Sequence, residues 1–387
     1  MKIARVSTVP FFLYNHLRSQ IIATIQAGHE VVLISSPGEE AAWLESISGV
    51  RFLAIDIPRK ISPLRDFVAL LRLYLLFKKE QFDIVHSTTP KAGMLCAIAG
   101  ALSGVPVRLH TFTGQAWMEM NGTLRWISKM GDRLTAHLNT LVYADSFSQK
   151  KFMLSERICA EQRIKVLASG SLSGVDLSRF DPELWTQTKE ATLRKLNIPP
   201  DHKVITFIGR LTKDKGIFEL IKAFASLRQG GYKCTLLLIG PREGDEMYFT
   251  DKKLSDSESG IHFLGYSLHP EKYLAITDVF CLPSYREGFA NVVIESAAMK
   301  VPTVGTDIVG LRDSVVNGET GILIPPKDPV ELAKALGYIL DNDHMRKEMG
   351  EKAQRRVNTE FSSERVNQAV LDEYEQHSVI NGIHKFT

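Results

Sequence analysis

Two carboxylates stand eight positions apart, at Glu287 and Glu295, around a Gly-Phe turn and a run of aliphatic residues. The strand-like run before them places Glu287 in a loop, and Asn291 is a favourable N-cap for a helix that carries Glu295 in its first turns. The helix dipole favours a carboxylate there, so an ordinary surface helix is one interpretation. Ile294 and the small residues 296–298 instead indicate close packing around Glu295. A carboxylate in such surroundings needs partners, and the two hydroxyls of a ribose would supply them.

Two cations lie five positions apart at Arg210 and Lys215, after another strand-like run and just before a helical pattern. Arginine can bind two oxygens, lysine supplies a point charge, and a helix N-terminus adds partial positive charge, so this loop suits a diphosphate. A basic surface loop is the alternative. Gly265 follows a third strand-like run, where it would let a nucleotide base lie against the backbone or would simply form a turn.

The first half of the chain holds three further candidates. Lys91 stands at a strand-to-helix turn in TTPKAG, where it could meet an acceptor diphosphate or merely be exposed. Residues 59–79 are apolar with basic residues at both ends, and residues 115–133 combine Trp117 and Trp126 with basic residues. Both segments could seat the protein on an anionic membrane surface, although the first equally resembles a buried crossover helix.

Strand-like apolar runs alternate with helical patterns almost throughout, as in repeated βαβ units with a parallel sheet. We expect strands within residues 2–8, 29–36, 50–56, 82–88, 105–112, 140–146 and 163–168, and within 203–209, 234–240, 261–266, 279–284, 301–307 and 320–326. The alternation pauses near residues 169–203, where Gly, Ser and Pro cluster. This predicts two Rossmann-like α/β domains facing across a cleft. They comprise residues 1–170 and 171–360, with a helix at about 361–387 crossing back to the first. Neither domain has G-x-G-x-x-G after its first strand, which argues against a dinucleotide oxidoreductase.

Composition narrows the functional class. The net charge of the 387-residue chain is only +3, too small to suggest a nucleic-acid partner. The four cysteines are scattered without a CxxC pair, which favours buried thiols in a reducing compartment. The sequence has no signal-peptide pattern and no long apolar run, so we expect a cytoplasmic protein with peripheral membrane contact as an option.

Together these motifs resemble the retaining glycosyltransferases of GT-B fold, family four (glycosyl transferases group 1). The resemblance covers nearly the whole chain and is strongest from about residue 170 to 326. It is carried by Glu287 with Glu295, by the GR…K-x-K-G stretch at 209–216, by GVD…F at 174–180, and by PSYREGF and VPTVGTDIVGLRDSVVNGETGILIPP. HSTTPKAG and HTFTG look like the bacterial members that extend sugars on polyprenyl-diphosphate carriers.

The resemblance implies roles for the matching residues. Glu295 would hold the ribose hydroxyls of the donor, and Arg210 with Lys215 would bind its diphosphate. Glu287 would contact hydroxyls of the transferred sugar, and His110 would reach that sugar from the first domain. The backbone amides near this sugar would be those of Gly288, Phe289 and Ala290.

One departure is at residues 8–12, where TVPFF stands in place of the usual glycine pair and would form a bulkier, apolar acceptor edge. No Asp-x-Asp metal pair stands out, so neither a metal nor another cofactor is expected, and Arg210, Lys215 and a helix N-terminus would stabilise the leaving diphosphate. The resemblance implies same-face attack in which a donor phosphate oxygen takes the acceptor proton. A covalent intermediate on an enzyme nucleophile remains the alternative.

The implied activity is a hexosyltransferase that moves a hexose or N-acetylhexosamine from a nucleotide sugar, with a UDP-sugar favoured. The acceptor would be a lipid-carrier-linked sugar in the synthesis of a surface polysaccharide such as lipopolysaccharide or capsule. Three alternatives stay open: a soluble transferase acting on a small sugar or sugar phosphate, a non-catalytic nucleotide-sugar-binding subunit, and a sugar-nucleotide epimerase.

Overall fold

The computed structural model describes residues 1–59, 61–242, 260–380 and 382. The chain divides into two compact units, Met1–Gly174 together with Ser363–Thr387, and Val175–Ser362. The division falls four residues beyond the boundary expected at residue 170. Part of the expected C-terminal helix, residues 381 and 383–387, lies outside the described residues.

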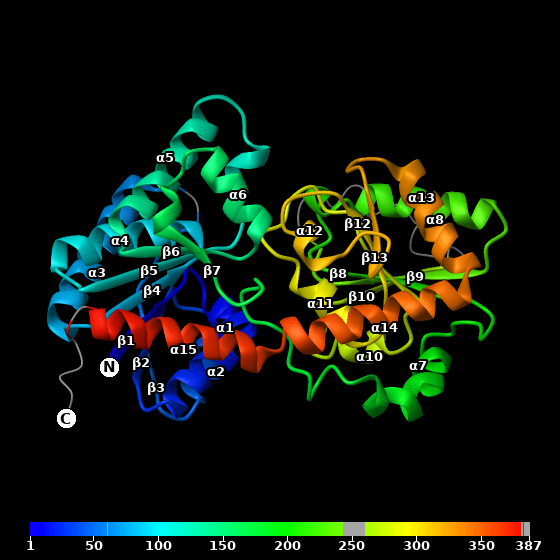
Figure 1. Ribbon diagram of the computed structural model, residues 1–387, viewed down its shortest axis with the longest axis horizontal. Helices are drawn as coiled ribbons and strands as arrows, with labels where there is room; N and C mark the ends of the chain where they lie inside the picture. Colours follow the sequence, from blue (N-terminus) through cyan, green and yellow to red (C-terminus); the bar gives the residue numbers. More distant parts are fainter. Residues whose placement is uncertain (60, 243–259, 381, 383–387) are drawn as a thin grey trace. The chain divides into compact units, whose positions relative to one another are not determined.

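The first unit is built on a seven-stranded parallel sheet in the order β3-β2-β1-β4-β5-β6-β7 (Figure 1). Its strands are β1 (Lys2–Val6), β2 (Glu30–Ser35), β3 (Val50–Ala54), β4 (Ile84–Thr88), β5 (Val107–Phe112), β6 (Leu141–Ala144) and β7 (Ile164–Val166). Most of these runs are short and apolar because both faces of the sheet are covered by helices, whereas the edge strand β3 has no buried residue.

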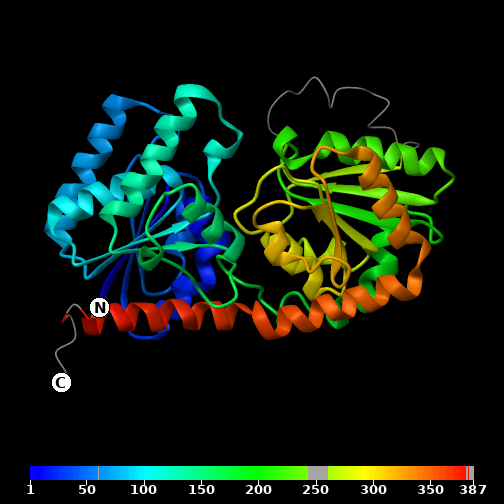
Figure 2. The same ribbon diagram turned by 45° about the horizontal axis from the view of Figure 1, so that its top comes forward.

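Helices α3, α4 and α5 lie on one face of this sheet, and α1, α2 and α15 lie on the other (Figures 1 and 2). The helices of this unit are α1 (Pro10–Gln26), α2 (Ala41–Glu45), α3 (Pro63–Glu80), α4 (Pro90–Ser103), α5 (Gly122–Leu138), α6 (Phe147–Ser155) and α15 (Ser363–Ile380). Helix α15 belongs to this unit because Val370 and Tyr374 pack into the core formed by β1, β4 and β5.

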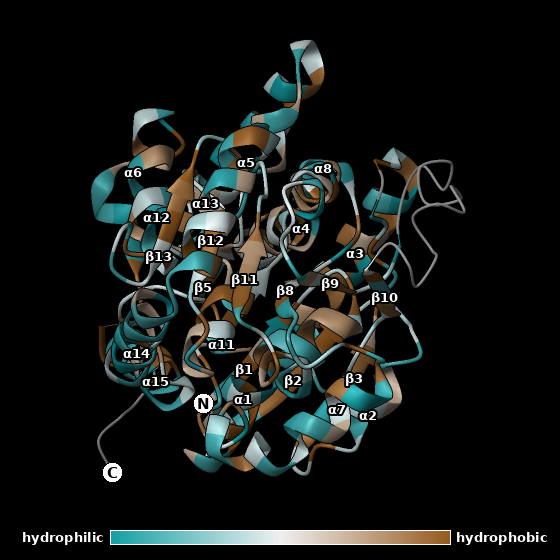
Figure 3. Cartoon of the chain, turned by 90° about the vertical axis from the view of Figure 1, so that its right-hand side faces the viewer, coloured by the Kyte–Doolittle hydropathy of each residue, from teal (hydrophilic) through white to brown (hydrophobic). Residues whose placement is uncertain are grey.

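The second unit holds a six-stranded parallel sheet in the order β10-β9-β8-β11-β12-β13. Its strands are β8 (Lys203–Ile208), β9 (Cys234–Ile239), β10 (Ile261–Gly265), β11 (Val279–Leu282), β12 (Thr303–Thr306) and β13 (Gly321–Ile324). All thirteen strands of the two sheets lie within the predicted ranges. Figure 3 shows apolar residues along β11 and β13, as expected for strands buried on both faces.

Helices α8 and α13 pack together on one side of the second sheet, and α11 and α14 pack together on the other (Figure 1). The helices of this unit are α7 (Lys189–Lys195), α8 (Ile217–Gln229), α10 (Glu271–Leu274), α11 (Asn291–Ala298), α12 (Leu311–Ser314), α13 (Pro329–Asp341) and α14 (Asp343–Glu360). Among the described residues, no helix is both long enough and apolar enough to cross a bilayer.

Candidate active site

The candidate donor site lies where the parallel strands of the second sheet end, because the loops after β8, β9 and β11 meet at that edge. Two glycines allow these loops to approach closely. Gly216 has φ +70°, and a Cβ there would overlap the carbonyl oxygen of Pro283. A Cβ on Gly240 would likewise overlap the carbonyl oxygen of Gly209. The three loops therefore form one closely packed rim.

The loop after β8 presents Arg210, whose guanidinium lies 3.9 Å from the carboxylate of Asp214. The same carboxylate lies 3.5 Å from the guanidinium of Arg286 and accepts a hydrogen bond of 2.5 Å from the hydroxyl of Thr212. Burial raises the pKa of Asp214, but this hydrogen bond and the neighbouring cations outweigh it, and the net shift is downward. A carboxylate that stays ionised thus orients two guanidiniums at the strand edge.

Lys215 and Glu287 form an ion pair across two of the loops, with Nζ 2.6 Å from Oε1. Both side chains are largely buried. Sequence reasoning assigned Lys215 to the diphosphate and Glu287 to the transferred sugar, without predicting that the two would touch. The pair places the two expected ligand groups next to each other and fixes the orientation of each.

Glu295 is the fifth residue of α11 and is only partly exposed. Its neighbours Ile294 and Ser296 are fully buried, so the predicted close packing is confirmed. Burial raises the pKa of the Glu295 carboxyl to about 7, while Arg179 acts to lower it and Glu271 to raise it further. A helix dipole alone would have lowered this pKa. Because the pKa is raised instead, burial outweighs the dipole, which argues against an ordinary surface helix. In the described part of the chain, no group donates a hydrogen bond to this carboxylate.

Arg179 and Glu271 complete the surroundings of Glu295, and sequence reasoning missed both roles. The Arg179 guanidinium donates to the carboxylate of Glu271 over 2.7 Å, and Nδ1 of His269 lies 3.1 Å from the other oxygen of that carboxylate. Glu271 is almost fully buried. One guanidinium therefore faces two carboxylates and is bonded to only one of them. The remaining carboxylate, Glu295, lacks donors and suits a ligand that brings hydroxyl groups.

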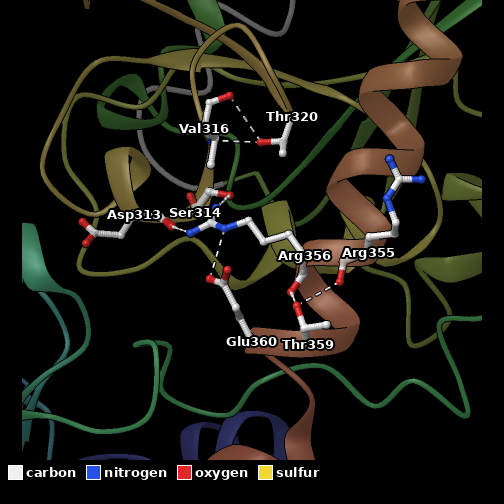
Figure 4. A network of polar contacts seen from close by, with 8 residues as sticks. All are labelled: Asp313, Ser314, Val316, Thr320, Arg355, Arg356, Thr359 and Glu360. Carbon is white, nitrogen blue, oxygen red and sulfur yellow. Dashed lines mark hydrogen bonds and ion pairs between the residues drawn. The ribbon is translucent and has the colours of Figure 1, made fainter.

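The turn between Glu287 and Glu295 is held in place by packing against Phe361. Phe289 packs against the ring of Phe361 with the ring centroids 5.4 Å apart, and the guanidinium of Arg356 lies over the same Phe361 ring. Arg356 also donates to the carbonyl oxygens of Asp313 and Ser314 and pairs with Glu360 (Figure 4). These contacts tie α14 to the segment after β12.

The remaining residues that were predicted to bind the nucleotide-sugar donor lie at this rim. One expectation about the helix start was wrong. Asn291 is not the N-cap of α11 but its first residue, and Ala290 takes the cap position without a side-chain hydrogen bond. Gly288, Phe289 and Ala290 lie directly before the helix, as expected. A Cβ on Gly265 would meet no atom within 4 Å, so space remains above this residue. Contacts of these four residues with a ligand stay predictions.

In the first unit, His110 lies on β5 and is buried, and its Nδ1 lies 2.9 Å from the hydroxyl oxygen of Ser87. Burial lowers the pKa of the imidazole to about 3, so the ring is neutral. Gly93 in the first turn of α4 lies directly against the ring, where a Cβ would overlap it. The structure therefore holds His110 within β5, as the fourth of its six residues, and its contact with a donor sugar remains a prediction.

Lys91 differs from the simplest expectation of an exposed cation. Its Nζ lies 2.7 and 2.8 Å from the two carboxylate oxygens of Asp66 on α3, and both side chains are largely buried. An acceptor phosphate at Lys91 would have to compete with Asp66. The sequence could not indicate this pair, because the two residues lie 25 positions apart on different helices.

Comparison with known proteins places the chain in a family. Residues 188–356 match the family model of glycosyl transferases group 1, and residues 15–169 match the glycosyl transferase 4-like domain. The chain is 31% identical over 349 residues to the capsular polysaccharide biosynthesis glycosyltransferase CapM of Staphylococcus aureus, with 90% of each chain covered. It is 27% identical over 302 residues to an Escherichia coli protein named UDP-Gal:alpha-D-GlcNAc-diphosphoundecaprenol alpha-1,3-galactosyltransferase, with 75% of each chain covered.

The fold agrees with this assignment. The crystal structure of Anabaena Alr3699/HepE in complex with UDP superposes with a TM-score of 0.80 at 18% identity, covering 97% of this chain and 100% of that one. The family match sets aside the non-catalytic and epimerase alternatives. The chain belongs to the glycosyl transferases of group 1 and is a glycosyltransferase of GT-B fold.

Proposed function

We propose that this glycosyltransferase moves a hexose or N-acetylhexosamine from a UDP-sugar to a sugar carried on a lipid diphosphate, with retention of the anomeric configuration. The observation that carries the donor half of this proposal is the Glu295 carboxylate, which is partly buried and lacks hydrogen-bond donors in the described part of the chain. A ribose supplies two vicinal hydroxyl donors and would satisfy this carboxylate.

The donor diphosphate would bind to Arg210 and Lys215 at the neighbouring loop. Arg286 adds a third cation there, oriented through the carboxylate of Asp214. Glu287 would accept hydrogen bonds from the transferred sugar while keeping its ion pair with Lys215. This pair then links the group that holds the sugar to the group that holds the leaving phosphate.

The proposed reaction breaks the bond between the anomeric carbon and the phosphate oxygen and forms a bond from the acceptor oxygen to the same carbon. Attack occurs on the face that the diphosphate leaves, and a phosphate oxygen takes the acceptor proton. Negative charge develops on the diphosphate, and Arg210, Lys215 and Arg286 would stabilise it. We propose that these cations suffice without a metal, so activity should persist in EDTA. His110, with a neutral imidazole, would contribute a hydrogen bond to the transferred sugar.

The acceptor proposal is supported by the relatives. The Escherichia coli relative is named for a diphosphoundecaprenol-linked acceptor and the Staphylococcus aureus relative for capsular polysaccharide biosynthesis. An acceptor of this kind implies action at the cytoplasmic face of a membrane. We propose Lys91 as a contact for the acceptor diphosphate, exchanging its carboxylate partner Asp66 for phosphate.

Replacement of single cations tests the donor assignment. Arg210→Ala should largely abolish UDP release from a UDP-sugar in the presence of acceptor. Lys213→Ala removes a positive charge from an exposed position of the same loop and should leave the rate near that of the wild type. Near wild-type turnover of Arg210→Ala would contradict the assignment, as would an equal loss in both variants.

A further inference from the structure

Helix α3 carries apolar side chains on both sides. Ala69, Leu73 and Phe77 point into the core of the first unit and are buried. The outward apolar residues are between 46% and 84% exposed, and they are Leu64, Phe67, Val68, Leu71 and Leu75, with Ile61 just before the helix. Residues 63–80 thus form the crossover helix between β3 and β4, as one of the two interpretations of residues 59–79 expected, but only one side of this helix is buried.

Helix α5 shows the same unusual exposure. Its outward apolar residues are between 37% and 65% exposed, and they are Leu124, Trp126, Ile127, Met130 and Leu134. Both helices pack against α4, which lies between them on one face of the sheet (Figures 1 and 2). We call these eleven residues the apolar face. Monomeric soluble proteins rarely expose so many large apolar side chains together, so the apolar face indicates a binding surface.

The charges on the two helices that lack an ion-pair partner in the described part of the chain are positive. Each carboxylate of the two helices is bonded to a group away from that face: Asp66 to Lys91, Glu80 to Lys2 and Arg51, and Asp132 to the indole of Trp117. The basic side chains of the two helices are Arg65, Arg72, Lys78, Lys79, Arg125, Lys129 and Arg133. Three of them, Arg72, Lys78 and Lys79, are exposed and have no ion-pair partner in the described part of the chain.

A groove on α3 combines both features at one place. It measures about 230 Å³ and is lined by Leu64, Val68, Arg65, Arg72 and Asp56. Arg65 is paired with Asp56 over 2.7 Å, so the exposed Arg72 supplies the uncompensated charge beside the apolar wall. A lipid carries a phosphate next to its acyl chains. Its phosphate could bind the guanidinium of Arg72 while an acyl chain contacts the apolar wall of the groove.

We infer that the apolar face docks this protein onto an anionic lipid bilayer, with the outward residues of α3 and α5 in the interface and the surrounding cations against lipid phosphates. Amphipathic helices with basic and aromatic residues bind bilayers in this way, and tryptophan favours the interfacial region. A second copy of the chain fits less well, because a two-fold interface through this face would bring its uncompensated cations together.

This surface goes beyond the donor site and is formed by residues that the proposed transfer does not use. It also lies beside the proposed acceptor contact, because Asp66 in the first turn of α3 holds Lys91. A bilayer docked on the apolar face would therefore lie near Lys91, where a lipid-linked diphosphate could be received. This last consequence rests on the proposed function, whereas the docking itself does not.

Co-sedimentation of the full chain with vesicles tests the inference. We expect binding to vesicles of equal parts phosphatidylglycerol and phosphatidylcholine, and none to phosphatidylcholine alone. Leu64→Ser combined with Phe67→Ser should weaken binding on the order of tenfold or more, and Arg72→Gln by about fivefold. The control pair Leu184→Ser with Val330→Ser removes two apolar side chains of the second unit that are each 61% exposed, and it should change nothing.

Trp126 supplies an independent readout. It is 65% exposed, so its fluorescence should shift to the blue when anionic vesicles are added, and Trp126→Phe should remove the shift. Circular dichroism and UDP binding verify that each variant is folded. The inference is overturned if the wild type ignores anionic vesicles, or if the Leu64 and Phe67 variant binds them as tightly as the wild type. It is equally overturned if lipid-free protein forms a dimer that this variant dissociates. None of these outcomes would affect the release of UDP from a UDP-sugar in the presence of a soluble acceptor analogue. Failure of the docking inference can therefore be distinguished from failure of the proposed function.

Discussion

Glu295→Gln should have opposite effects on function and on stability, because a partly buried carboxylate without hydrogen-bond donors among the described residues destabilises the ligand-free protein. Burial raises the pKa of Glu295 to about 7 from the usual value of 4.5. Between these two values the folded protein holds a proton that the unfolded chain releases. The stability that this proton provides is fully present below about pH 4.5 and is lost as the pH rises through 7.

The magnitude follows from the shift. Each pKa unit corresponds to about 1.4 kcal/mol, so ionising Glu295 in the folded state costs about 3 kcal/mol above pH 7. Glutamine has nearly the same shape and does not titrate. The free energy of unfolding of Glu295→Gln, relative to the wild type, should therefore increase by up to about 3 kcal/mol between about pH 5 and about pH 8.5.

Urea unfolding of the ligand-free protein at these two pH values measures this difference. Glu190→Gln is the matched control, because the Glu190 side chain is 84% exposed and its replacement should give no pH-dependent change. If the difference between Glu295→Gln and the wild type is the same at both pH values, burial does not raise this pKa and our reasoning about the site is wrong.

Donor binding should respond in the opposite direction. A carboxylate can accept both ribose hydroxyls with charge assistance, whereas the amide of glutamine offers one acceptor oxygen. Loss of a charge-assisted hydrogen bond costs roughly 1.5–3 kcal/mol, so UDP should bind roughly tenfold to a hundredfold more weakly to Glu295→Gln. Isothermal titration calorimetry with UDP gives this number, and unchanged affinity would contradict the ribose assignment.

Two further substitutions test residues that support the site. Gly93→Ala should displace the ring of His110, lower kcat on the order of tenfold and cost about 1–3 kcal/mol of stability, as measured by enzyme kinetics and thermal unfolding. Gly131→Ala is the control, because its Cβ would meet only Met94 at 3.7 Å, and it should keep full activity in the same assays. Asp214→Asn should lower kcat/KM for the donor roughly fivefold, because it weakens the contacts that orient the guanidinium of Arg210; an unchanged or higher kcat/KM would refute the orienting role.

Much of the fold could be predicted because each buried strand of a parallel sheet is a short apolar run. The strand ends also predicted that the loops carrying Arg210, Lys215 and Glu287 lie at one edge of the second sheet, since such edges collect the loops that bind ligands. The ion pair between Lys215 and Glu287 was beyond sequence reasoning, because its partners lie 72 positions apart and meet only through the order of β8 and β11.

Other features were hidden for related reasons. Arg179 and Glu271 lie 92 positions apart, and no spacing rule connects them with each other or with Glu295. The apolar run in α3 could not distinguish a buried helix from a two-sided one, because both are rich in leucine. Only the packing of α3 against α4 and the core of the first unit reveals which leucines face outward.

The most direct measurement of the central claim is mass spectrometry of the products formed from a UDP-sugar and a sugar linked to polyprenyl diphosphate. We predict that the lipid-linked acceptor gains one α-linked sugar, that UDP is released in equal amount, and that Arg210→Ala forms neither product. Hydrolysis of the donor without a new lipid-linked product, or extension only of free sugars, would contradict the proposed acceptor, and a β-linked product would contradict retention for an α-linked donor.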